Sequence, residues 1–143
     1  TRPIRHDGYD KVTGRAQYGA DIKLPGMIFG AVLRSPHAHA KILNIDTSKA
    51  ENMNGVFAVM TAKDLPRLTD KQRGNSEESG SEKHLSENVM ALDKVLYKGH
   101  VVAAVSAKDV NTAREAVKKI NVEYEVLKPV INVDQAMEKG API

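Results

Sequence analysis

Hydrophobic and polar residues alternate in several short stretches of this chain, which is the pattern of half-buried β-strands. We expect such strands over residues 41–46 and 121–127, and further short strands over residues 15–18, 56–60 and 94–97. In the 41–46 stretch, Ile42 and a later Ile should face the core. In the 121–127 stretch, Glu123 and Glu125 share a face that should meet solvent.

Two longer runs are more continuously apolar. Residues 27–34 predict a largely buried strand, and residues 101–107, rich in β-branched side chains, predict a central one. Turn signals bound these runs: Pro25-Gly26 fits a type II turn, and Ser35-Pro36 fits a bend because Pro has no amide donor.

Helical spacing with a clear apolar face occurs once, between residues 109 and 120, where Asp109 is placed to cap the helix. The apolar positions of that helix are Val110, Ala113, Ala116, Val117 and Ile120. Shorter helices are expected over residues 49–53, after the capping residues 46–48, and over residues 134–139, ended by Gly140.

These elements predict an α+β fold with mixed sheets and short helices, in one domain spanning residues 1–143. The strand–helix–strand order of residues 101–127 favours a right-handed β-α-β crossover. Residues 1–9 should form an extended N-terminal arm. From Thr69 to His84 no side chain is apolar, so residues 69–87 should form a polar, mobile loop.

Composition excludes several functional classes. With 41% hydrophobic and 27% charged residues the chain has an ordinary globular composition, and no apolar run is long enough for a membrane helix. A net charge of +3 without Trp, and with 4% aromatic residues, argues against a nucleic-acid partner. The absence of Cys leaves no thiolate for zinc or an iron–sulfur cluster, and we expect a cytoplasmic location.

Two histidines are the sharpest chemical candidates. His37 and His39 lie two residues apart, and in an extended segment such positions point the same way, toward one ligand or metal. A third ligand is not evident, and hydrogen bonding of the imidazoles to backbone at a bend explains them as well. His6, His84 and His100 are scattered.

No other set of residues suggests catalysis. The aspartates at 7, 10, 21 and 46 sit beside turn or cap residues, where a carboxylate serves local hydrogen bonds. Ser35 lacks a nucleophile-elbow context, and the glycines form no phosphate-binding loop. We therefore assign no catalytic, cofactor-binding or metal-binding residue within the chain.

An ordered set of short motifs does, however, resemble one known family along nearly the whole chain. The motifs are Asp7-Gly8, residues 11–14, Ala16, Tyr18, Asp21, residues 25–27, residues 33–40, Ile45-Asp46, Ala50, Gly55-Val56, Ala58-Val59, residues 64–66, Val95, Tyr97, residues 99–105, residues 122–125 and Leu127. The string Leu-Arg-Ser-Pro-His-Ala-His-Ala over 33–40 is the most distinctive of them. Together they resemble the xanthine dehydrogenase and aldehyde oxidase family of molybdenum hydroxylases, in the α/β hammerhead domain of the large, molybdopterin-binding subunit.

The resemblance implies a parent oxidoreductase that hydroxylates aldehydes, purines or related heterocycles with oxygen from water. It implies molybdopterin, iron–sulfur clusters and FAD in an oligomeric parent, with the catalytic residues outside this chain. The domain itself would be structural, packing between the iron–sulfur and molybdopterin parts and lining the substrate channel. Residues 68–85 form a long, polar stretch that joins the two halves of the chain, so we also expect them near that channel or an interface. Two alternatives stay open: a stand-alone binding module using His37 and His39, and a separately encoded small subunit of a split enzyme.

Overall fold

Three antiparallel strands form the larger of two sheets in the computed structural model, which describes residues 3, 5–65 and 88–141. In this sheet, called sheet A, β5 (Val101–Ala107) lies between β1 (Phe29–Arg34) and β3 (Val56–Thr61). The predicted central position of the 101–107 run is confirmed, since four of its residues are buried: Val102, Ala103, Val105 and Ala107.

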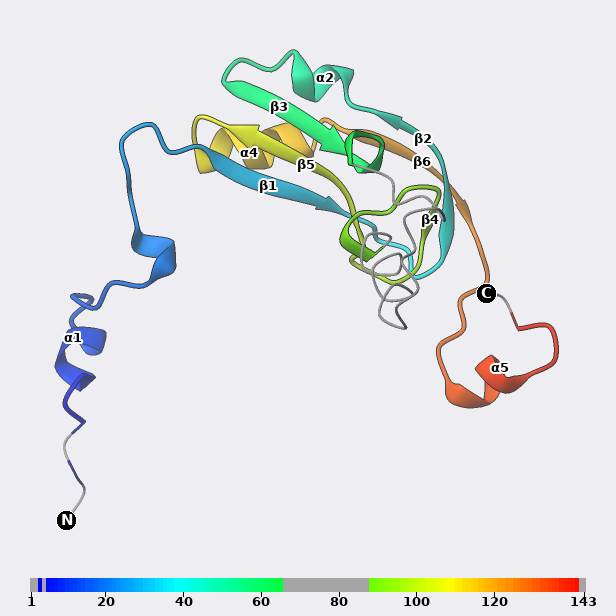
Figure 1. Cartoon of the computed structure of the whole chain (residues 1–143), viewed down its shortest axis with the longest axis horizontal. Helices are drawn as coiled ribbons and strands as arrows, with labels where there is room; N and C mark the ends of the chain where they lie inside the picture. Colours follow the sequence, from blue (N-terminus) through cyan, green and yellow to red (C-terminus); the bar gives the residue numbers. More distant parts are fainter. Residues whose placement is uncertain (1–2, 4, 66–87, 142–143) are drawn as a thin grey trace, which may run out of the picture.

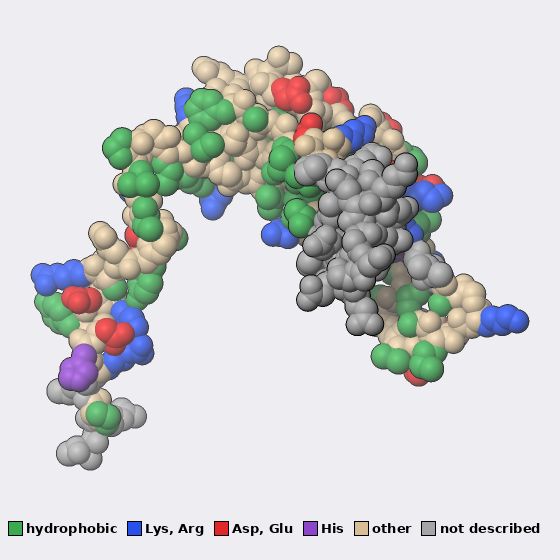
Figure 2. Space-filling view, in the orientation of Figure 1, with side chains coloured by type: hydrophobic (Ala, Val, Ile, Leu, Met, Phe, Trp, Pro, Cys, Tyr) green, Lys and Arg blue, Asp and Glu red, His purple; other side chains and the backbone are tan. Residues whose placement is uncertain are grey.

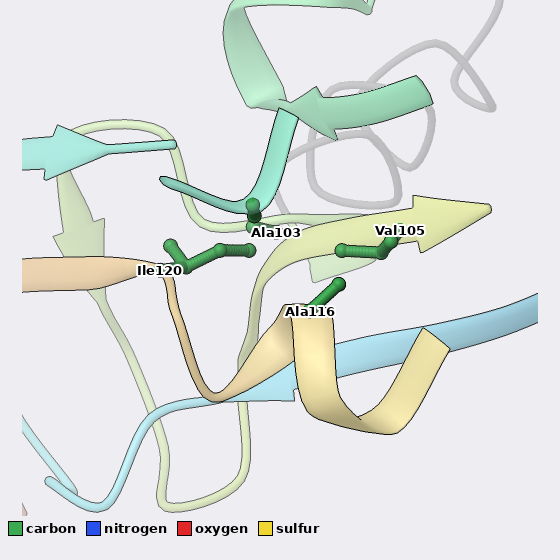
Figure 3. Close-up of a cluster of buried hydrophobic side chains, with 5 residues drawn as sticks. Ala103, Val105, Ala116 and Ile120 are labelled. Carbon is green, nitrogen blue, oxygen red and sulfur yellow. The ribbon is translucent and has the colours of Figure 1, made fainter. Parts of the chain in front are cut away.

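One face of sheet A is covered by α4 (Val110–Val117), as Figures 1 and 3 show. Asp109 caps this helix by accepting a hydrogen bond from the Thr112 amide at 2.8 Å, as predicted. Ala116 on α4 points toward Val105 on β5, and Ile120 lies near Ala103 (Figure 3). The small side chains of α4 let it approach the sheet closely. Val110, predicted for this apolar face, is instead 40% exposed.

The second sheet, sheet B, is also antiparallel, with β2 (Ala40–Asp46) between β4 (Lys94–Val95) and β6 (Asn121–Val126). The register of β2 against β6 shifts between Ile42 and Asn44. This irregularity lets Ile42 and Ile45, three residues apart, both pack on the core, while Leu43 is exposed. The prediction of two core-facing isoleucines is confirmed.

The two sheets pack against a common core, but no described strand of one sheet is paired with a strand of the other. Ile45 and Val122 of sheet B touch both buried clusters, one around Val105 and one around Val102. The α+β class is confirmed, although every pairing among the described strands is antiparallel, so neither sheet is mixed there. The expected β-α-β crossover is wrong: β5 and β6 belong to different sheets, because α4 carries the chain from one sheet to the other.

The N-terminal segment differs most from prediction. A short helix α1 (Gly8–Val12) and a 3₁₀ turn η1 (Gly19–Asp21) interrupt it, so the predicted extended arm over 1–9 ends in a helix. Residues 15–18 do not form the predicted strand, since none of the described strands pairs with them. In Figure 1 this segment descends from one end of the sheets and the C-terminal segment from the other, giving the outline of an arch.

The remaining elements agree broadly with prediction. The predicted short helices are α2 (Ser48–Glu51) and α5 (Val133–Met137), which Asn132 caps. A 3₁₀ turn that was not predicted, η2 (Ala62–Asp64), follows β3. Gly26 adopts a φ of 75° in the predicted turn. The predicted buried strand over 27–34 is shorter, and its residues alternate between half-buried and exposed. The predicted loop over 69–87 lies outside the described residues.

Candidate functional site

Ser35 anchors the bend that follows β1. Its hydroxyl accepts a hydrogen bond from the His37 amide (3.0 Å) and donates to the His37 carbonyl (3.2 Å). Its backbone amide donates to the His100 carbonyl, and its carbonyl accepts from the Gly99 amide, both at 2.9 Å. Ser35 is 3% exposed, so it ties the bend to the turn before β5 and is not presented as a nucleophile.

His100 lies at the centre of this region and is fully buried. The Leu96 amide donates to its Nδ1 at 3.3 Å, which places the proton of the ring on Nε2. Its imidazole stacks on the Tyr97 ring with a centroid separation of 4.5 Å. Sequence reasoning passed over His100; the signal available was a single His next to an apolar strand, directly after a turn glycine.

His37 and His39 do not converge on one ligand. His39 Nδ1 donates to the carbonyl of Lys128 at 2.9 Å. His37 instead meets the Tyr124 ring edge-on, with centroids 5.0 Å apart. The expectation that both imidazoles point the same way assumed a regular strand, whereas residues 35–39 form a bend around Pro36. The contact of His39 with a backbone carbonyl matches the structural alternative.

Tyr124 on β6 completes this group of side chains. Burial raises the pKa of its hydroxyl, while a hydrogen bond with Ser35 acts in the lowering direction. The phenol therefore stays protonated at neutral pH and does not serve as a base.

An open cleft of about 320 Å³ lies beside His39. It is lined by Ala38, His39, Leu96, Tyr97, Lys98 and residues 129–131. Its size is at the lower end for small-ligand sites. Tyr97 and Lys98 on its rim are exposed, and Ile131 is 79% exposed, so its wall is incomplete.

The carboxylates serve local structure. Asp21 accepts from the Tyr18 amide and Asp46 from the Ser48 amide, both at 3.0 Å, as predicted. Hydrogen bonds from Ser48 lower the pKa of Asp46. Glu123 and Glu125 are exposed, as predicted. Within residues 3, 5–65 and 88–141, no three His, Asp or Glu side chains gather to hold a metal ion.

Both terminal segments expose large apolar side chains. In the N-terminal segment these are Tyr9, Val12, Tyr18, Ile22, Leu24 and Ile28, and in the C-terminal segment Ile131, Val133 and Met137. Figure 2 shows hydrophobic side chains on both legs of the arch. Such exposure is typical of surfaces that pack against other protein. None of the described helices is long and apolar enough to cross a membrane.

Comparison with known families gives a specific match. Residues 13–128 match the family model described as "Aldehyde oxidase and xanthine dehydrogenase, a/b hammerhead domain". The matched stretch contains both sheets and the bend from Ser35 to His39.

Relatives and solved structures agree with this match. The chain is 43% identical over 130 residues to the carbon monoxide dehydrogenase large chain of Afipia carboxidovorans, covering 91% of this chain and 15% of the relative. It is 38% identical over 138 residues to a probable xanthine dehydrogenase component of Bacillus subtilis, covering 96% and 17%. A crystal structure of Cu,Mo-CO dehydrogenase superposes with a TM-score of 0.78 at 38% identity, covering 99% of this chain and 17% of that one. The chain thus spans under a fifth of the length of these relatives.

Proposed function

Because the chain belongs to the aldehyde oxidase and xanthine dehydrogenase family as its a/b hammerhead domain, we propose that it is a structural domain of a molybdenum hydroxylase. In this proposal the rest of the parent protein holds molybdopterin, iron–sulfur clusters and FAD. The chain packs between the iron–sulfur and molybdopterin parts and lines the substrate channel. The parent works in the cytoplasm as an oligomer.

The match over residues 13–128, combined with the small share of each relative that the chain covers, is the observation that carries this proposal. The chain's own chemistry agrees with a supporting role. It has no Cys, so it offers no thiolate ligand for an iron–sulfur cluster. The clusters and the molybdenum would be bound elsewhere in the parent.

The arch-like outline supports a role between other domains. Apolar residues of the N-terminal segment, among them Val12 at 85% exposed and Leu24 at 65%, are left open by the part of the chain that the structure describes. Covering such side chains stabilises a protein by roughly 25 cal/mol per Å² of apolar surface. Contact with neighbouring domains would therefore hold the hammerhead domain in place.

The reaction class follows from the family. The parent would convert R–H and water into R–OH, two protons and two electrons, the molybdenum centre supplying this redox chemistry. Relatives are named for aldehydes, xanthine and carbon monoxide, so the substrate is an aldehyde, a purine-like heterocycle or carbon monoxide. Carbon monoxide has no C–H bond, and with water it would give carbon dioxide, two protons and two electrons.

The test is to purify the parent protein containing this chain and measure its metal content and its oxidation of the three substrate classes. We expect bound molybdenum and turnover of one class. A matched variant, His37→Ala/His39→Ala, should leave metal content unchanged if these residues serve only structure. A parent that assembles without molybdenum, or that loses metal specifically with the two histidines, would contradict the proposal.

A further inference from the structure

One face of sheet A carries uncharged residues that the described part of the chain leaves accessible. Arg34 lies on the side opposite α4 at the end of β1, where its Nη1 donates to the Gly99 carbonyl at 2.9 Å. The uncharged residues on that side of β1, β3 and β5 are Gly30, Val32, Ala58, Met60, Ala104 and Ser106. We call this set the open face. Val32 is 44% exposed and Met60 37%, whereas Val105, next to Ala104 but facing α4, is 2% exposed. Figure 2 shows hydrophobic side chains in the region of these strands.

The register shows that the open face is continuous. Ala104 pairs with Val32 on one side and Met60 on the other, and Ser106 pairs with Gly30 and Ala58. Paired residues in antiparallel strands share a face, so these residues form two adjacent rows across the sheet. The hydroxyl of Ser106 donates to the Ala58 carbonyl at 3.4 Å, so this polar group has a partner within the sheet. The open face is therefore suited to apolar contact.

The small residues on the open face permit close approach by another backbone. Neither the backbone conformation nor the described surroundings of Gly30 require a glycine there. Its φ is not positive, and an added Cβ would meet only the Val105 carbonyl oxygen at 3.9 Å, an ordinary contact. A glycine with room for a side chain, in a strand where glycine is unfavourable, fits a site where a partner approaches closely.

The size of the open face favours an occupant tethered to this chain. Its few, mostly small side chains bury far less than the roughly 800 Å² per partner that a stable interface between separate proteins needs. A segment of the same polypeptide docks at high effective concentration and needs less area. The relatives are about six times longer than the matched stretch. A parent protein of that length would contain such a segment.

We infer that the open face is an internal interface of the parent protein, covered by an uncharged apolar surface of the parent's own polypeptide outside residues 1–143. This inference rests on the proposed function for the existence of that polypeptide. It goes further by naming the surface, its residues and the chemistry of the partner.

Because the chain contains no Cys, an introduced Cys reports on one position. The experiment compares Val32→Cys on the open face with Leu43→Cys, a 63% exposed apolar residue on β2, in the assembled parent protein. Maleimide labelling of each site is followed by peptide mass spectrometry, which separates the new Cys from others in the parent. We expect Cys at position 32 to react about tenfold or more slowly than Cys at position 43, and the difference to vanish after denaturation.

Each outcome decides a separate point. Equal labelling at the two positions would overturn the inference, because the open face would then meet solvent. Protection that disappears on dilution would assign the face to a second copy, and protection lost on removing a separate subunit would assign it to that subunit; either overturns the inference. Protection at position 32 in a parent without molybdenum would uphold the interface while contradicting the proposed function.

Discussion

The outward faces of the two sheets differ sharply in chemistry. On sheet B, the residues Lys41, Asn44, Glu123 and Glu125 are exposed and polar, and Lys41 Nζ lies 3.1 Å from Glu125 Oε2. We call this set the charged face. On sheet A, the open face has similar access to solvent but is uncharged, with Arg34 at its border at the end of β1. Strands of similar length in one small domain thus carry two different surfaces, which indicates that water covers one and protein the other.

The largest expected effect comes from placing a charge on the open face. Val32→Lys in the parent should cost about 3 kcal/mol or more, because the partner surface would bury an unpaired ammonium. The yield of assembled, molybdenum-containing parent should fall steeply. Leu43→Lys, a matched change on sheet B, should assemble as the unchanged protein does; equal losses from both variants would remove the distinction between the faces.

A smaller effect is expected when the close approach at Gly30 is blocked. Gly30→Val should cost the parent about 2 kcal/mol through overpacking at the interface, since the chain's own structure accommodates the side chain. Thermal inactivation of the parent measures this cost. Asn44→Val, which places the same side chain on an exposed strand position of sheet B, is the control. A Gly30→Val protein as stable as the control would indicate that nothing approaches the open face closely.

The ion pair on the charged face should contribute little. Lys41 and Glu125 are about half exposed, so their interaction is worth roughly 0.5 kcal/mol or less. A double-mutant cycle with Lys41→Ala and Glu125→Ala, read by thermal unfolding at low and high salt, checks this value. A coupling several times larger would mean that this face is also buried in the parent.

The smallest effect concerns the helix that covers the other side of sheet A. Hydrogen bonds from Thr112, chiefly from its backbone amide, lower the pKa of the Asp109 carboxyl in the folded protein. A lowered folded-state pKa adds stability above the unfolded value of 3.8, and this stability is lost as pH falls through the folded pKa. The contribution of Asp109 to the melting temperature should therefore be constant near neutral pH and be lost in acid. Asp109→Asn keeps a cap acceptor and should weaken that acid dependence; an unchanged profile would contradict the assignment.

The sequence predicted local structure better than long-range pairing. Ile42 and Ile45 were identified as core residues, and Asp109 as a cap, because such signals depend on near neighbours in the chain. Alternation tells which face of a strand is buried but not which strand lies beside it. For that reason β6 was expected to follow β5 in one sheet, while it pairs with β2.

The candidate site shows the same difference between local signals, which the sequence reveals, and long-range contacts, which it does not. His37 and His39 were found from their spacing, but their partners Tyr124 and Lys128 lie more than 80 positions along the chain, where no local pattern connects them. The open face was equally hidden. Val32 and Met60 become neighbours of Ala104 only through the register of β1 and β3 against β5.

A structure of the assembled parent protein tests the central claim most directly, through the solvent exposure of the two faces. The account predicts that Gly30, Val32 and Met60 are buried against residues of the same polypeptide outside 1–143, while Lys41 and Glu123 remain exposed. An open face that stays in contact with solvent in the complete enzyme would contradict it.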